Sequence, residues 1–155
     1  MPLSETVRYL NTRNRVRHPE LNGSGDALDI QRDRVVAQFG EFVLSSRFAA
    51  IVEVSRGRVV AHEAVVTTRT RGGALVSNDV LFSRPLGDEE VVYLDRLCRT
   101  MHALNFVEEA PGSRQLVLDV NPRHLSVVRD HGTVFETILK QAGLSSDSVV
   151  IQLAA

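Results

Sequence analysis

The sequence contains few of the residues that build special scaffolds or reactive centres. It has one cysteine, no tryptophan and two tyrosines among 155 residues, which excludes a disulfide framework and a cysteine-based zinc site. No apolar run approaches the roughly 18 residues that a membrane-spanning helix needs. The N-terminus lacks the apolar segment of a secretory signal, so we expect a cytoplasmic protein. The net charge of −1 argues against a generally basic nucleic-acid binder.

The length sets a limit on the fold. A chain of 155 residues suffices for one compact domain, whereas a closed (β/α)8 barrel needs about 250 residues. The spacing of apolar residues predicts a short amphipathic helix over Ser4–Arg17, and Asn22–Gly25 is typical of a flexible joint. We therefore divide the chain into an N-terminal helical arm with its linker, residues 1–25, and an α/β domain, residues 26–155.

The N-terminal helix carries four arginines between positions 8 and 17. Such a cluster contacts nucleic acid, an acidic partner or only solvent. Nucleic-acid recognition usually adds aromatic side chains, and Tyr9 is the only aromatic residue in this helix. We therefore expect a solvated or protein-docking helix face, and nucleic acid is the less favoured partner.

The α/β domain alternates between helical and strand periodicity. A near-continuous apolar stripe predicts a helix from Asp26 or Asp29 to about Val43. Two strands joined by a short turn then predict an antiparallel hairpin. The order β-α-β-α-β that follows demands parallel pairing. The expected elements after the first helix are strands at Phe48–Val54 and Val59–Arg69, a helix at Asp88–Phe106, a strand at Gln115–Asn121, a helix ending before Gly143 and a strand at Val149–Leu153.

Polar side chains interrupt two of these apolar strands. Glu63 lies within one strand, and Asn121 ends the next. Ligands and metals bind at the carboxyl ends of strands in parallel α/β folds, and carboxylate and amide oxygens suit a hard cation such as Mg2+. The alternative is that Glu63 is a satisfied structural residue and that Asn121 caps the following turn.

At these residues the chain resembles the EAL family of cyclic-di-GMP phosphodiesterases. The family's first strand, of the type YQPIV, is similar to FAAIV (Phe48–Val52), and its Glu-Ala-Leu motif is similar to HEAVVT (His62–Thr67). Three more similar segments follow in the family's order: Leu94-Asp95-Arg96, Val120-Asn121-Pro122, and Gln152–Ala155. The resemblance covers about residues 33–155. It implies a partial, half TIM-like α/β barrel with about four strands, the first two antiparallel, and an N-terminal helical extension.

The resemblance implies metal ligands at Glu63 and Asn121, but the third ligand position of the family is Ala155, which offers no lone pair. Gln152 lies where the family has an earlier Glu. Metal-assisted hydrolysis needs a cation held firmly enough to lower the pKa of a bound water. We therefore interpret the metal site as vestigial. We expect no catalytic residue and no cofactor, with Mg or Mn present only if the vestigial site is occupied.

Two further family positions are lost. Thr67 replaces a phosphate-binding Arg, and Ala49 replaces a Gln of the first strand. A dianionic cyclic dinucleotide thereby loses a charge-assisted contact of roughly 1.5–3 kcal/mol, so cyclic-di-GMP is a doubtful ligand. The family's remaining catalytic residues lie on strands five to eight, whereas this sequence reaches strand four.

The remaining candidates are expected to be structural. The histidines show no HxH or HxxxH pair, and Cys98 lies on the apolar stripe of a helix. Those histidines are His18, His62, His102, His124 and His131. The strand Val149–Leu153 leaves one sheet edge with unpaired backbone groups and is too apolar for solvent. We expect a homodimer, a protein partner, the chain's own N-terminal helices or a longer parent protein to cover it.

These observations predict a catalytically inactive EAL-like module of bacterial signalling that acts through protein–protein interaction. Two alternatives stay open. One is a receptor that binds cyclic-di-GMP without cleaving it. The other is the N-terminal half of a phosphodiesterase that another chain or a longer parent protein completes.

Overall fold

The computed structural model describes residues 2–21, 25–109, 115–121 and 131–153. Its elements in chain order are α1 (Leu3–Arg17), β1 (Leu28–Gln31), β2 (Arg34–Phe39), β3 (Phe42–Glu53), β4 (Arg58–Thr70), β5 (Leu75–Val76), α2 (Asn78–Ser83), α3 (Asp88–Glu109), β6 (Leu116–Val120), α5 (His131–Ala142), a 3-10 turn (Ser146–Ser148) and β7 (Val149–Leu153). The strands form one seven-stranded sheet in the order β1-β2-β3-β4-β6-β7, with β5 paired to β4.

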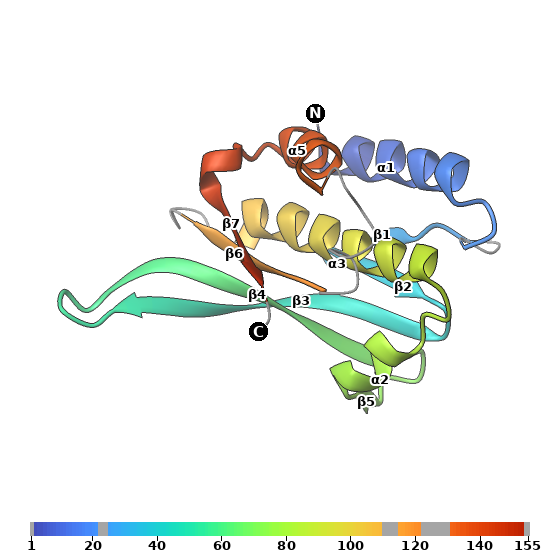
Figure 1. Ribbon diagram of the computed structural model, residues 1–155, viewed down its shortest axis with the longest axis horizontal. Coiled ribbons are helices and arrows are strands. Elements are labelled where there is room, and N and C mark those ends of the chain that lie inside the picture. The colour runs from blue at the N-terminus through green and yellow to red at the C-terminus, as the bar shows by residue number, and fades with distance from the viewer. Residues whose placement is uncertain (1, 22–24, 110–114, 122–130, 154–155) are drawn as a thin grey trace.

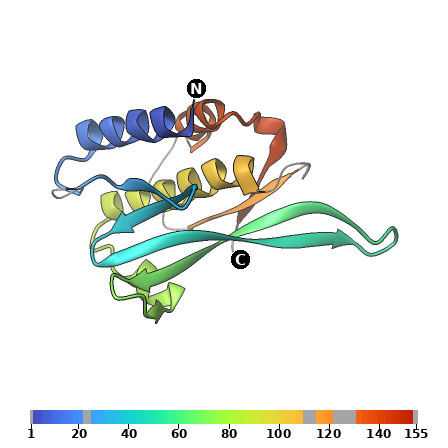
Figure 2. The same ribbon diagram turned by 180° about the vertical axis from the view of Figure 1, so that it is seen from behind.

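Three of the helices, α1, α3 and α5, are stacked on one side of this sheet, whereas the short α2 lies beside β5, away from this stack (Figure 1). α3 lies over the sheet, and α1 and α5 lie over α3 (Figures 1 and 2). The long hairpin of β3 and β4 projects beyond the helical layer (Figure 1). The predicted α/β class is confirmed, but the sheet has three strands more than the four that the sequence predicted.

The four predicted strands correspond to β3, β4, β6 and β7. β3 and β4 pair antiparallel over most of their length, with Ala49 opposite Glu63 and Ser45 opposite Thr67. β4 pairs parallel with β6, and β6 pairs parallel with β7. The antiparallel hairpin followed by parallel strands is therefore confirmed.

The predicted helix from Asp26 or Asp29 to Val43 is wrong. This segment forms β1, β2 and the start of β3, joined by two-residue turns. The first turn holds Arg32 and Asp33 at φ 52° and 64°, the conformation of a type I′ hairpin turn. The second turn has Gly40 at φ 56°, and Gly favours the left-handed region there because it has no Cβ. Local turns therefore override the helical spacing of the apolar residues.

The core lies between the sheet and α3. All residues of α3 from Val91 to Phe106 are buried except Arg96, because the sheet covers one side of the helix while α1 and α5 cover the other. The predicted apolar stripe of this helix is confirmed: Leu94, Leu97, Cys98, Met101 and Leu104 all belong to one buried cluster. A second cluster joins β6 to Phe135, Ile138 and Leu139 of α5.

Two buried asparagines form hydrogen bonds with strand backbone groups that are not paired with a neighbouring strand. Asn11 of α1 accepts from the Leu28 N–H (2.9 Å) and donates to the Leu28 carbonyl (2.8 Å). Asn105 of α3 does the same for Val35, at 2.8 and 2.7 Å. Buried backbone groups without partners are costly. Asn11 therefore covers the outer edge of β1, and Asn105 fills the place where β2 and β3 diverge.

The N-terminal helix is part of this core. Val7 and Leu10 of α1 are buried in the same cluster as Leu28 and Leu94. The predicted joint at Asn22–Gly25 lies largely outside the described residues. Among the helices that the structure describes, none has both the length and the apolar character that crossing a membrane requires.

Candidate functional site

The predicted site residues that the structure describes lie on the sheet face opposite α3. Side chains alternate between the two faces of a strand, and residues paired in register share a face. Leu116 and Leu118 of β6 enter the core under α5, so Asp119 and the residues paired with it face away from the helices. We call this surface the open face and define it by residues from four neighbouring strands: Ala49, Glu63, Thr67, Asp119 and Gln152.

Glu63 is joined there by a second carboxyl group, that of Asp119. Burial raises the pKa of Asp119, and the neighbouring charge of Glu63 and a hydrogen bond to it raise that pKa further. Two carboxyl groups this close favour sharing one proton over carrying two charges. The sequence analysis missed Asp119, although its position two residues before Asn121 places both residues on the same side of a strand.

Asn121 is tied to the helical layer through its backbone. Its N–H donates to Asp95 Oδ1 at 3.1 Å. The other Asp95 oxygen pairs with Arg99 (3.2 Å), with both side chains almost fully buried. The Arg99 guanidinium also lies 4.4 Å from the ring centre of Phe135 in α5. The Leu94-Asp95-Arg96 segment therefore fixes the end of β6 and links α3, β6 and α5.

The positions that differ from the EAL pattern are now placed. Ala49 lies directly opposite Glu63, and Gln152 lies opposite Asp119. Thr67 is two residues from Val65 on the same face of β4 and pairs with Ser45. Ala155 and the Pro122–Leu125 segment lie outside the described residues. The structure thus brings Ala49, Glu63 and Gln152 onto neighbouring strands of one face.

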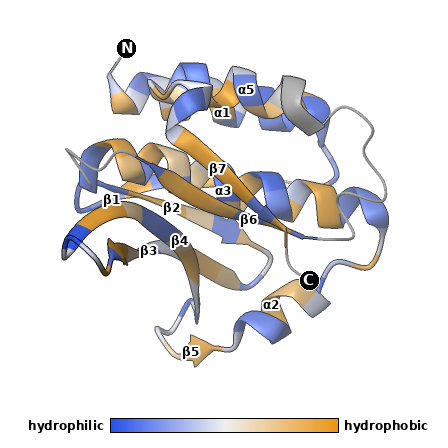
Figure 3. Cartoon of the chain, turned by 60° about the vertical axis from the view of Figure 1, so that its left-hand side comes forward, coloured by the Kyte–Doolittle hydropathy of each residue, from blue (hydrophilic) through white to orange (hydrophobic). Residues whose placement is uncertain are grey.

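β7 forms an exposed margin of the sheet. Within the described part of the chain it pairs with β6 and with no further strand. Three of its apolar residues are strongly exposed: Val150 by 39%, Ile151 by 41% and Leu153 by 60%. Figure 3 shows β7 as a largely hydrophobic strand. β7 has no charged residue, so this margin carries none of the charges that usually block strand pairing.

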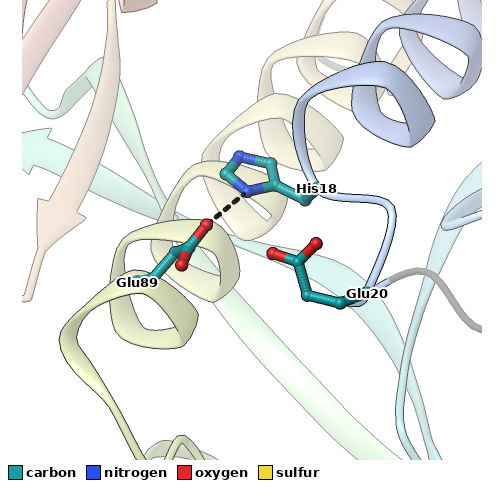
Figure 4. Close-up of side chains that lie close together, drawn as sticks. All are labelled: His18, Glu20 and Glu89. Atoms are coloured by element: carbon teal, nitrogen blue, oxygen red, sulfur yellow. Dashed lines mark ion pairs between the residues drawn. The ribbon is translucent and has the colours of Figure 1, made fainter.

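One cluster of potential metal ligands lies away from the open face. His18, Glu20 and Glu89 point toward one another (Figure 4), with their ligand atoms within 4.8 Å of each other. His18 Nδ1 and Glu89 Oε1 are 3.5 Å apart. This ion pair joins the segment after α1 to the first turn of α3, and both glutamates are exposed.

The remaining candidate side chains have structural positions. Cys98 is buried, and burial raises the pKa of its thiol to about 12, so it is not a nucleophile near neutral pH. His102 is buried and 2.7 Å from Ser46 Oγ through its Nδ1. Burial lowers the pKa of His102 to about 4. Both residues belong to α3 and support its packing against the sheet.

The comparisons with known proteins concern the fold. No family model and no curated protein matches the chain. Among solved structures, Klebsiella pneumoniae BlrP1 with FMN and cyclic diGMP is similar at 24% identity and TM-score 0.58, over 72% of this chain and 28% of that chain. A standalone EAL protein from Vibrio cholerae O395 in its c-di-GMP-bound form is similar at 16% identity and TM-score 0.57, over 73% of this chain and 45% of that one.

A second BlrP1 structure, the manganese and cyclic-diGMP complex at pH 6, is similar at 18% identity and TM-score 0.59. It matches 94% of this chain and 37% of that chain. The chain therefore has an EAL-like fold and spans less than half the length of these proteins.

Proposed function

We propose that this chain is a catalytically inactive EAL-like signalling module that acts through protein–protein contact, as a half-barrel whose sheet continues into a second copy of the chain. The observation that carries the proposal is the exposed apolar margin formed by β7. Strand addition at such a margin satisfies backbone groups and buries apolar side chains in one step.

The second copy is the simplest partner because β7 is self-complementary. A two-fold axis at the margin places β7 antiparallel to its symmetry mate, and the two identical surfaces then contact each other. The strand Val149–Leu153 brings no charge into this contact. No like-charge repulsion therefore opposes the pairing.

The open face supports the absence of catalysis in this proposal. The described residues offer there the carboxylate oxygens of Glu63 and Asp119, the amide oxygens of Asn121 and Gln152, and the hydroxyl of Thr67. Burial and the neighbouring charge of Glu63 raise the pKa of Asp119, so the pair favours one shared proton over two charges and attracts a cation less than two carboxylates would. A hydrolytic metal ion needs ligands that hold it firmly enough to activate water, and we propose that this vestigial set does not.

Dimerisation is tested by light scattering coupled to size exclusion. We expect a mass of twice 17.1 kDa for the wild-type chain. Val150→Lys introduces a charge into the apolar margin and should shift the protein to the monomer at the same concentration. The matched control is Val54→Lys, because Val54 is 95% exposed in the β3–β4 hairpin; this variant should remain dimeric.

Two results would contradict the proposal. A wild-type monomer at about 100 μM would exclude the second copy as the partner, since standard interfaces hold well below that concentration. Hydrolysis of cyclic-di-GMP by the purified chain with Mg2+ or Mn2+ would exclude catalytic inactivity.

Cyclic-di-GMP binding without hydrolysis is the second candidate. It is favoured by the placement of Glu63 on β4 and of Asn121 directly after the neighbouring strand β6, and by the cyclic diGMP in the similar structures. Against it, the pair of Glu63 and Asp119 keeps a negative charge on this face even with one shared proton, and this charge repels a dianion. Thr67 supplies no positive charge. Calorimetry with cyclic-di-GMP distinguishes this receptor from the interaction module proposed above. We expect no heat of binding at about 100 μM ligand, a concentration that would detect specific binding with a Kd of up to roughly 100 μM.

A further inference from the structure

Residues of α1, α3 and α5 line a small cavity. These three helices form the helical side of the molecule (Figure 1). The cavity measures about 40 Å3, which is room for about three water molecules and close to the size of one tetrahedral oxyanion. Its wall includes three arginines: Arg13 and Arg17 from α1 and Arg96 from α3. The rest of the wall includes the apolar residues Leu10, Leu97 and Ile138, so the cavity is a small space with three arginines on an otherwise largely uncharged wall.

The three guanidinium groups act on one another. Burial lowers the pKa of Arg17, and the charge of Arg13 lowers it further. Burial likewise lowers the pKa of Arg96, with an added contribution from Arg17. Like charges that influence each other's ionisation lie close together. This repulsion is a cost that a bound anion would remove.

The acidic groups nearby are engaged elsewhere. Asp95 raises the pKa of Arg96 through its charge, but its oxygens bind Arg99 and the Asn121 N–H. Glu89, beside the cavity wall, pairs with His18. Among the residues that the structure describes, no carboxylate forms an ion pair with Arg13, Arg17 or Arg96.

We propose that this cavity binds the phosphate group of a small phosphorylated molecule. Guanidinium forks match the oxygens of a phosphate bidentately. A phosphate monoester carries about −1.5 to −2 charges and three acceptor oxygens, which suits three arginines better than the single charge of a carboxylate does. Thr100 also lines the cavity, but its hydroxyl donates to the Arg96 carbonyl oxygen (2.7 Å), so the phosphate contacts are assigned to the arginines alone.

The bound phosphate would join α1 to α3, because the arginines come from both helices. The site lies on the opposite side of α3 from the sheet and is separate from the open face and from β7. Its occupancy is therefore measurable without reference to dimerisation or to cyclic-di-GMP.

The experiment follows the thermal unfolding of the full chain as inorganic phosphate or methyl phosphate is added, against NaCl of equal ionic strength. We expect a saturable rise in melting temperature that NaCl does not produce. Arg17→Gln and Arg96→Gln should each weaken the apparent phosphate affinity about tenfold or more, since each removes a charge-assisted contact. Arg8→Gln is the matched control, because Arg8 is exposed on α1 and does not line the cavity.

The melting temperature of Arg17→Gln without phosphate separates a phosphate-binding role of Arg17 from a structural role. Without phosphate, Arg17→Gln should melt at the wild-type temperature or above it, because the substitution removes repulsion. A rise in melting temperature with phosphate that is no larger than the rise with NaCl would overturn the proposal. An equal rise in wild type and Arg17→Gln would overturn it as well.

If Arg96→Gln does not fold, the double variant Arg13→Gln/Arg17→Gln of α1 provides the same test. A response to inorganic phosphate but not to methyl phosphate would overturn the assignment to a phosphorylated molecule.

Discussion

Ser46 connects two buried polar side chains of α3 to the sheet. Its Oγ accepts from Asn105 Nδ2 (3.1 Å) and lies 2.7 Å from His102 Nδ1. The assignment that uses every donor has the Ser46 hydroxyl donating to an unprotonated Nδ1, with the imidazole proton on Nε2. This network requires neutral His102, and burial lowers the pKa of that residue to about 4.

The depressed pKa of His102 predicts a loss of stability in mild acid. Above pH 6.5 His102 is neutral in both the folded and the unfolded chain and contributes no pH dependence. As the pH falls from 6.5 towards 4, the unfolded chain binds a proton that the folded chain cannot. The free energy of unfolding should therefore fall by about 2 kcal/mol between pH 7.5 and pH 5 on account of this residue, as measured by urea denaturation.

The comparison with His102→Gln isolates this contribution. The variant retains every other titrating group, including His18 and His62, so these cancel when the two pH profiles are subtracted. Its stability should depend less steeply on pH than that of the wild type, whatever its stability at pH 7.5. Parallel pH profiles for the two proteins would show that His102 takes up its proton without unfolding.

At the scale of elements, sequence periodicity located the longer helices and strands from Phe48 onward, missed the short β5 and α2 in a segment predicted to be a loop, and failed for residues 26–43. Ile30, Val35, Val36, Phe39, Phe42 and Val43 have helical spacing, yet they lie on two successive hairpins. The deciding features are local: two turns with positive φ, which a spacing analysis does not weigh. Gly40 was the residue that argued against a helix here, because Gly inside a helix costs about 1 kcal/mol of stability relative to Ala.

The Gly40 turn leads to a prediction about β2 and β3. Gly40 has φ 56°, and a Cβ there would meet no neighbouring atom within 4 Å. Gly40→Ala should therefore destabilise the protein through its backbone conformation and not through a steric clash. We expect the free energy of unfolding, measured by chemical denaturation, to fall by about 1–2 kcal/mol. Gly25→Ala adds the same methyl group in open space without a positive φ and should be nearly neutral. Equal stability of the two variants would contradict the turn assignment.

At the scale of the whole molecule, the candidate site was predictable only in part. Glu63 and Asn121 were found because they interrupt apolar strands. Asp119 was missed, since its contact with Glu63 depends on the register between β4 and β6, which the sequence does not specify. The arginine cavity depends on the packing of α1 against α3 and α5, and no spacing within one helix reveals such a meeting of helices.

The placement of α1 also bears on how the chain is divided. The sequence predicts a division into an N-terminal helical arm with its linker, residues 1–25, and an α/β domain, residues 26–155. In the structure Val7 and Leu10 are core residues, and Asn11 satisfies both backbone groups of Leu28 at the outer edge of β1. Removing the arm deletes Val7 and Leu10 from the core, where the burial of each contributes roughly 1.5–3 kcal/mol. It also takes Asn11 away from the Leu28 N–H and carbonyl, at a cost of roughly 1–3 kcal/mol.

We therefore predict that the fragment 26–155 is unstable on its own. The summed loss is a large part of the roughly 5–15 kcal/mol that stabilises a domain, so the fragment should lack a cooperative thermal transition or aggregate on size exclusion. In the full chain, the milder Asn11→Ala should lower the free energy of unfolding by about 1–3 kcal/mol, whereas Arg8→Ala on the exposed side of α1 should change it little. A fragment that melts cooperatively at the temperature of the full chain would contradict this prediction. It would show that residues 26–155 fold independently and that the edge of β1 does not need α1 to cover it.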